Sequence, residues 1–290
     1  MTLSEFELEM PSDLQETLAF LPGATPLGGG TDLLVGLRAR REESKRLVWL
    51  GNIHAFREIK IDAQEVTIGG GTTLSDILHN PDMAEVAPSL VGAARVFGGQ
   101  MVRNRATVAG NICSGSPAAD TVPPLLSLDA NIRLTNTEGC HTVPLDQFYM
   151  GFKKNLRRQD ELVTGLSWMA PSPNTANLFY KLARRKGDAI TVVGVAVTIT
   201  RKGDRCTHAR IALGAVGPTV FRAKHAEAIL TGGILSKKLI EDAAQKAMEE
   251  ANPIDDFRAS ADYRRHSVYV LTRRLISQAW KSLPEKEAGT

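Results

Sequence analysis

Two runs of three glycines are the residues of this chain best suited to hold an anion. They are Gly28-Gly29-Gly30, followed by Thr31 and Asp32, and Gly69-Gly70-Gly71, followed by two threonines. Consecutive glycines let neighbouring backbone N–H groups point at one anion, because no Cβ stands in the way. A helical pattern follows each run and adds a field of the same sign. The runs indicate a phosphate or pyrophosphate site, although either run alone is better explained as a tight turn between touching elements.

A third segment, residues 100–120, gathers hydroxyls, amides and small side chains with few large apolar groups. Thr107, Asn111 and Ser116 can donate hydrogen bonds to phosphate oxygens. Asp120 could accept both hydroxyls of a ribose. A polar surface loop with local side-chain caps is the alternative, but no charge occurs between Arg105 and Asp120, which argues against an ordinary solvated loop of this length.

Other site chemistries are excluded by spacing. The fingerprint GxGxxG fails because Leu33 and Leu74 stand where the last glycine is needed, and no GxxxxGK[ST] occurs. The three cysteines are scattered and form no CxxC, so this chain alone cannot ligate an iron–sulfur cluster. The six histidines form no zinc-binding pair, and no metal site is predicted.

Length and composition indicate an ordinary folded protein. The 290 residues are 43% hydrophobic and predict two or three subdomains. The 35 basic and 32 acidic residues nearly balance, and a net charge of +3 does not indicate nucleic acid or an anionic membrane as a partner. No apolar stretch approaches the roughly 20 residues of a membrane span, and the first ten residues lack a signal pattern. An odd number of separated cysteines favours a reducing cytoplasm.

The elements that must position these residues follow from periodicity. The first sixty residues predict a β-α-β-α-β unit, whose first helix starts at a capping box of Ser12 and Gln15. Beyond it we expect a strand at 65–68, helices at 74–79, 85–97 and 123–130, and a hairpin over 132–143. After a linker at 171–174 come strands at 178–182, 192–200 and 209–215, then helices at 235–250 and 261–283. The last helix carries an apolar stripe, and the tail after Pro284 is expected to be frayed.

Three segments in register resemble the FAD-binding (medium) subunit of the molybdenum hydroxylases, the xanthine dehydrogenase and carbon monoxide dehydrogenase family. They are residues 27–32, residues 100–120 with the sequence QMVRNRATVAGNICSGSPAAD, and residues 179–190. A late segment, DDFRASADYRRHSVYVLTRRLI, is similar to the C-terminal helix region of that family. The resemblance covers essentially the whole chain.

The resemblance implies an α+β fold. A two-lobed FAD-binding domain of the PCMH or vanillyl-alcohol-oxidase type would cover residues 1–174, with lobes at about 1–57 and 58–174. A C-terminal α+β domain would cover residues 175–290. The implied function is that of an oxidoreductase subunit, in which FAD accepts electrons from 2Fe–2S clusters of a partner and passes them to an acceptor such as NAD.

The implied complex contains an iron–sulfur small subunit and a molybdopterin large subunit, as a dimer of heterotrimers. The 2Fe–2S clusters and the molybdenum cofactor would belong to those partners only. The basic run Arg184-Arg185-Lys186 and the arginines of the last helix are candidates for docking, although solvated faces explain them more simply.

The resemblance also implies roles for single residues. The pyrophosphate and ribityl part of FAD would be held by Gly28, Gly29, Gly30, Thr31 and Asp32, with Leu27 against the flavin. Further contacts in the pyrophosphate region would come from Thr107, Gly110, Asn111 and Ser116. Asp120 would hold the adenosine ribose, and adenine would lie between Phe97 and Val163.

At the flavin end, the resemblance implies that Lys181 approaches the polar edge of the isoalloxazine and that residues 187–190 form a loop over one ring face. No catalytic residue is assigned, and Lys181 is only placed near the flavin ring. The competing interpretations are a core aromatic for Phe97 and a surface lysine for Lys181. For the whole chain, they are a self-contained FAD-dependent oxidase of related fold, or a structural subunit that has lost the cofactor.

Overall fold

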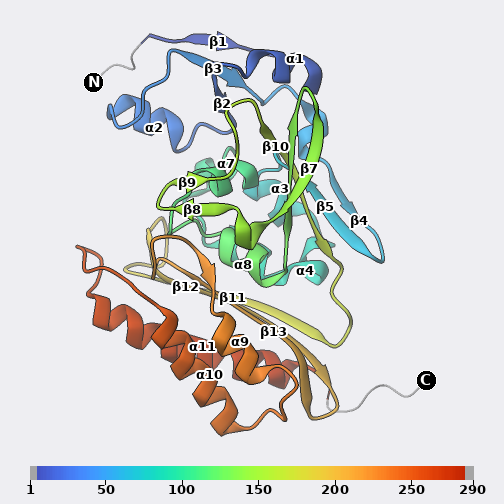
Figure 1. Ribbon diagram of the computed structural model, residues 1–290, viewed down its shortest axis with the longest axis vertical. Helices are drawn as coiled ribbons and strands as arrows, with labels where there is room; N and C mark the ends of the chain where they lie inside the picture. Colours follow the sequence, from blue (N-terminus) through green and yellow to red (C-terminus); the bar gives the residue numbers. More distant parts are fainter. Residues whose placement is uncertain (1–4, 285–290) are drawn as a thin grey trace.

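A computed structural model describes residues 5–284 and shows stacked layers of sheet and helix (Figure 1). A small N-terminal lobe lies at one end, a five-stranded sheet with helices lies in the middle, and a four-stranded sheet with three helices forms the other end. The tail after Pro284, for which fraying was expected, lies outside the described residues. Within the described part of the chain, no helix is long and apolar enough to cross a membrane.

The N-terminal lobe is the predicted β-α-β-α-β unit. Its elements are β1 (Glu7–Glu9), α1 (Leu14–Phe20), β2 (Thr25–Leu27), α2 (Leu33–Arg38) and β3 (Arg46–Trp49). The strands form a parallel sheet in the order β1-β3-β2. The predicted capping box is wrong by one residue: the side chain of Asp13 caps α1 by accepting from the Glu16 N–H, and the Glu16 carboxylate accepts from the Ser12 N–H at 2.8 Å. An aspartate oxygen is at least as good a cap as a serine hydroxyl.

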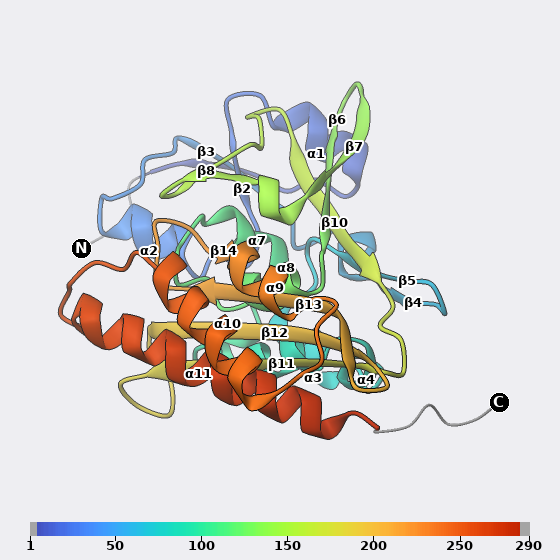
Figure 2. The same ribbon diagram turned by 60° about the horizontal axis from the view of Figure 1, so that its bottom comes forward.

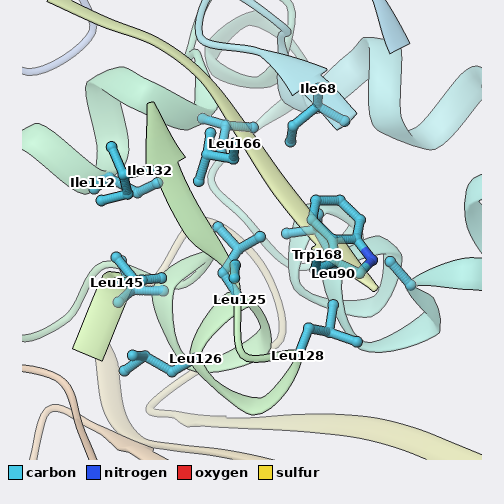
Figure 3. Close-up of a cluster of buried hydrophobic side chains, with 14 of the residues drawn as sticks. Ile68, Leu90, Ile112, Leu125, Leu126, Leu128, Ile132, Leu145, Leu166 and Trp168 are labelled. Carbon is cyan, nitrogen blue, oxygen red and sulfur yellow. The ribbon is translucent and has the colours of Figure 1, made fainter. Parts of the chain in front are cut away.

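The middle layer is an antiparallel sheet in the order β4-β5-β10-β6-β7. Its strands are β4 (Ile59–Ile61), β5 (Glu65–Gly69), β6 (Asn131–Asn136), β7 (Gly139–Pro144) and β10 (Leu162–Met169). Short helices pack on it: η1 (His54–Arg57), α3 (Leu74–His79), α4 (Met83–Val86), α5 (Pro88–Arg95), α6 (Gln100–Arg103), α7 (Val108–Cys113), α8 (Val122–Ser127) and η2 (Leu145–Gln147). Sheet and helices enclose one apolar core around Trp168, Leu166 and Leu125 (Figure 3).

Two sequence expectations differ from this layer. The single helix expected over residues 85–97 is two helices, because Ala87 (φ −149°, ψ 56°) breaks the chain before Pro88, and the residue before a proline avoids the α region. Strand β10 was not predicted, because as the central strand it is buried almost throughout and shows no alternation of polar and apolar residues. The predicted hairpin at β6 and β7 is confirmed.

The C-terminal layer is an antiparallel sheet of β11 (Thr175–Ala183), β12 (Thr191–Lys202), β13 (Arg205–Gly214) and β14 (Phe221–Arg222). Helices α5 and α8 cover one face. Helices α9 (Lys224–Leu230) and α11 (Ala261–Ser282) cover the other face (Figure 2). Helix α10 (Lys237–Glu250) packs outside on α9 and α11. The expected stripe of α11 is buried, from Val268 to Ala279. A small hairpin of β8 (Tyr149–Gly151) and β9 (Lys154–Asn155) completes the fold.

Candidate functional site

A cavity of about 720 Å³ lies where the three layers meet, a size typical of cofactor pockets. Its wall contains the residues proposed to contact the cofactor, Leu27, Gly28, Gly29, Gly30, Thr31, Asp32, Phe97, Thr107, Gly110, Asn111, Ser116, Asp120, Val163 and Lys181, but neither Gly69 nor Gly187. Three residues of the loop between β11 and β12, Asp188, Ala189 and Ile190, also line it. The fold thus brings residues that are far apart in the sequence together in the wall of one cavity.

The first glycine run forms an open backbone cradle in that wall. Among the residues that the structure describes, no backbone carbonyl or side chain accepts a hydrogen bond from the N–H groups of residues 28–32. Gly30 has a positive φ of 73°, which glycine adopts at little cost. The three glycines are half-buried and Thr31 and Asp32 are exposed, so their N–H groups are open to solvent or to a ligand in the cavity. These groups therefore suit an anionic ligand, such as a phosphate.

Gly29 also has a packing role within the protein. A Cβ on Gly29 would lie 1.7 Å from the carbonyl oxygen of Arg105, and a Cβ on Gly28 would lie 3.0 Å from Thr107 Oγ1. The glycine loop is therefore pressed against the segment that leads into α7. This run is therefore a tight turn between touching elements, as one interpretation predicted. Because the contact with Arg105 holds the loop in the cavity wall, the anion-cradle interpretation applies as well.

The second glycine run serves packing. The N–H groups of Gly69, Gly70 and Gly71 donate to the carbonyls of Glu58, Thr164 and Phe56. A Cβ on Gly70 would lie 2.3 Å from the Val163 carbonyl oxygen, and one on Gly69 would lie 2.2 Å from that of Phe56. The phosphate site that this run also suggested is not present, because its donors are already used.

The polar segment supplies side-chain donors. Thr107 caps α7: its Oγ1 accepts from the Gly110 N–H at 3.1 Å, so its own hydroxyl hydrogen is available to a ligand and the Gly110 N–H is not. Asn111 Oδ1 accepts from the hydroxyl of Thr121 at 2.7 Å, which leaves the amide NH₂ as a donor. Ser116 Oγ accepts from the Ala118 N–H at 3.2 Å and keeps its O–H. Donors of this kind match phosphate oxygens.

Apolar walls come from Phe97 and Val163. Val163 is 4% exposed and lies on the central strand β10, while Phe97 follows α5 and is half-buried. Phe97 packs against the main core and also lines the cavity, so the core interpretation and the binding interpretation both describe it. Such a slot suits a flat aromatic group.

A buried ion pair between Lys181 and Asp120 also lines the cavity. Lys181 Nζ lies 2.6 Å from Asp120 Oδ2 and also donates to the Val96 carbonyl at 3.3 Å. The hydroxyl of Thr191 donates to Asp120 Oδ1. Burial raises the pKa of Asp120, while Lys181 and Thr191 act against that rise. The Lys181 side chain is only 6% exposed, so the surface-lysine interpretation is wrong.

This contact constrains the roles implied for the two residues. The resemblance assigned Asp120 to the adenosine ribose and Lys181 to the isoalloxazine, which are opposite ends of an extended FAD. The two side chains touch, so they address one end of any extended ligand. Thr191, which also bonds Asp120, directly follows the loop expected over the flavin ring.

Several lining residues were missed from the sequence. Arg41, Arg57, Arg105, Lys153 and Arg157 line the cavity, where they outnumber the exposed acids Asp32, Glu42 and Asp188, and Lys153 pairs with Glu42 at 3.7 Å. The basic residues come from separate segments, and no local motif identifies them. Cys113 also lines the cavity, and burial raises the pKa of its thiol to about 11, which keeps it neutral. Within residues 5–284, no group of three His, Cys, Asp or Glu side chains could hold a metal ion.

Comparison with known proteins agrees with this geometry. Residues 4–168 match the family described as the FAD binding domain in molybdopterin dehydrogenase. Residues 178–279 match the CO dehydrogenase flavoprotein C-terminal domain.

Individual relatives align over nearly their full length. The carbon monoxide dehydrogenase medium chain of Hydrogenophaga pseudoflava is 30% identical, over 95% of this chain and 97% of the relative. The putative xanthine dehydrogenase FAD-binding subunit of Escherichia coli K12 is 28% identical, over 92% of each chain. A solved structure of the Hydrogenophaga pseudoflava enzyme, lacking the Mo-pyranopterin moiety of its cofactor, superposes with a TM-score of 0.94 at 30% identity, covering 98% of this chain and 100% of the other. Quinoline 2-oxidoreductase from Pseudomonas putida 86 gives 0.90 at 28% identity, with 97% and 99% covered.

Proposed function

Because this chain belongs to the family of FAD-binding subunits of molybdenum hydroxylases, we propose that it carries electrons from a partner's 2Fe–2S clusters, through FAD, to an acceptor such as NAD. The main support for this proposal is that the backbone N–H groups of residues 28–32 have no acceptor among the described residues and lie in the wall of a cavity of cofactor size. FAD would supply the redox chemistry when bound, and an acid–base pair from the chain is not required.

The residues present fit FAD. Gly28, Gly29, Gly30, Thr31 and Asp32 would hold the pyrophosphate, which has the charge that their N–H groups suit. The hydroxyls of Thr107 and Ser116 and the amide of Asn111 would add donors, with Gly110 close by but its N–H already bonded. Arg105 and its basic neighbours in the wall favour the same dianion. Phe97 and Val163 would enclose the adenine.

We assign Lys181 to the polar edge of the isoalloxazine, with Leu27 also against the flavin. The direct contact with Lys181, and the loop that ends at Thr191, support placing Asp120 at the same end, instead of at the ribose. An ammonium group beside the ring edge stabilises negative charge there and favours the reduced form.

The domain division proposed is 1–174, with lobes at about 1–57 and 58–174, and 175–290. It is supported by the separate sheets of the three layers. A cytoplasmic location is supported by the three free cysteines.

The partners proposed are an iron–sulfur small subunit and a molybdopterin large subunit in a dimer of heterotrimers. Two exposed apolar side chains support docking nearby: Ile190, which lines the cavity and is 61% exposed, and Phe257, which is 80% exposed. The basic run is adjacent, since Arg184 Nη1 donates to the Phe257 carbonyl at 3.1 Å. Arg264 is 1% exposed, so it cannot belong to a docking face as the sequence suggested for the arginines of α11.

FAD uptake tests the function directly. We expect the purified chain to bind one FAD per polypeptide, measured by flavin absorbance against protein concentration after gel filtration. A folded but colourless chain that takes up no added FAD would contradict both the proposed function and the alternative of a self-contained flavoenzyme. That result would favour the structural subunit.

Lys181→Met tests the flavin end. We expect a lower midpoint potential of bound FAD with binding retained, because the cation that favours the reduced form is removed. The measurement is a potentiometric titration of the FAD-loaded chain. Lys186→Met is the matched control, since Lys186 is exposed in the basic run and does not line the cavity. An unshifted potential in Lys181→Met would remove Lys181 from the ring edge.

A further inference from the structure

The segment before α11 contains a small, strongly bonded ionic cluster. Asp256 accepts from Arg258 twice, from Nε at 3.0 Å and from Nη2 at 2.6 Å. Its other oxygen accepts from Arg264 Nη2 at 2.5 Å. The two guanidinium groups hold the pKa of Asp256 well below its usual range, with Arg258 as the largest cause. The carboxylate therefore fixes Arg258 in one orientation.

Arg264 anchors this cluster to the C-terminal sheet. Its Nη1 donates to the Ala215 carbonyl at 2.9 Å, directly after β13. The side chain is buried, so it cannot rearrange without disturbing the packing of α11. Arg258 is thus held by an anchored carboxylate, and its remaining Nη1 has a defined direction.

That Nη1 donates to the carbonyl of Thr191 at 3.1 Å. Thr191 is 2% exposed and is the first residue of β12, directly after the loop that lines the cavity. The pairing of β11 with β12 is irregular at this point, with a register shift between Leu182 and Ala183. Thr191 still pairs with Ala183 beside this irregularity, and Arg258 supplies a further tie from outside the sheet.

The hydroxyl of Thr191 reaches into the site. It donates to one oxygen of Asp120, whose other oxygen is paired with Lys181. A continuous chain of contacts therefore runs from Arg258 to the ion pair in the cavity, through the backbone and then the side chain of Thr191. Arg258 itself does not line the cavity.

We propose that Arg258 is a positioning residue that tunes the bound flavin without touching it, by holding Thr191 against the Asp120–Lys181 pair. The inference rests on the proposed function, because it needs FAD in the cavity. Without the guanidinium, Thr191 loses its tie, and the pair loses the hydroxyl that fixes Asp120. Lys181 then has a less defined place beside the ring edge.

The test uses the FAD-loaded chain with Arg258→Met. We expect a lower midpoint potential, in the direction expected for Lys181→Met, and FAD affinity weakened roughly three- to tenfold, the range for one lost hydrogen bond. Arg258→Lys should restore part of the potential. Arg265→Met is the matched control, since Arg265 lies on α11 and pairs with Asp262 at 3.1 Å, away from the cavity.

Thr191→Val provides a second, independent variant. It keeps the branched shape suited to a strand and removes only the hydroxyl, and we expect the same direction of shift. A double-mutant cycle of Arg258→Met with Asp120→Asn tests whether Arg258 acts through Asp120. If it does, the midpoint-potential shift of the double variant will differ from the sum of the two single shifts. Additive shifts would overturn the inference.

The outcomes distinguish this inference from the proposed function. Wild-type potentials in FAD-loaded Arg258→Met and Thr191→Val would overturn the positioning role alone. If Arg258→Met does not fold, Thr191→Val decides the question by the same criterion. A wild-type chain that binds no FAD would overturn the proposed function first.

Discussion

Gly29→Val is expected to abolish FAD binding while leaving the fold intact. The new Cβ would lie 1.7 Å from the Arg105 carbonyl oxygen, so the loop must move away from the start of α7. The N–H groups of residues 28–32 would then no longer converge. Several bonds to a charged group are lost together, each worth about 1.5–3 kcal/mol, so affinity should fall at least about a hundredfold.

Fluorescence titration with FAD measures this loss, and circular dichroism with thermal unfolding checks the fold. Gly99→Val is the control: its backbone is extended (φ −90°, ψ 171°), and an added Cβ meets no atom within 4 Å. It should bind FAD as the wild type does. A folded Gly29→Val chain with wild-type affinity would refute the cradle.

The isolated chain is expected to have no turnover with a purine, an aldehyde or carbon monoxide. Its three cysteines are free and scattered, and within residues 5–284 no cluster of side chains could hold a metal ion. Of the acids that line the cavity, the buried Asp120 is already bonded to Lys181 and Thr191, and Asp32, Glu42 and Asp188 are exposed. Under the proposed function, electrons enter from another polypeptide. At most, NADH should drive reduction of an artificial acceptor.

Steady-state assays of the FAD-loaded chain, alone and after addition of iron–sulfur and molybdenum subunits, measure this dependence. Activity should rise from none to full turnover only in the complete mixture. Substrate oxidation by the pure single chain would instead support the self-contained oxidase. The control is the FAD-loaded chain assayed without the added subunits.

Much of the fold was predictable because its signals are local. The apolar stripe of α11 and the alternation of strands and helices in the first sixty residues follow directly from spacing. Strand β10 escaped prediction because both its faces are covered. The break at Ala87 could have been predicted from Pro88, since the rule for residues before proline is local as well.

The site was predictable in part for the same reason. A glycine run shows in the sequence that backbone approaches something closely, but not what it approaches. Only the structure reveals that Gly29 faces Arg105 and that the second run meets Phe56 and Val163. The pairing of Lys181 with Asp120 joins residues 61 positions apart, through the packing of the C-terminal sheet on the middle layer. No periodicity encodes that contact.

The cavity wall draws on all three layers, from the glycine loop of the N-terminal lobe to Lys181 in the C-terminal sheet. A ligand held by all three layers is released when any one of them unfolds locally. Its binding free energy therefore stabilises each layer against local unfolding. At a concentration one hundred times its Kd, a ligand adds about 2.7 kcal/mol to such stability. Proteolysis follows the population of opened chains. We therefore expect the lifetime of this polypeptide in a cell to depend on flavin supply, with chains made without FAD degraded first.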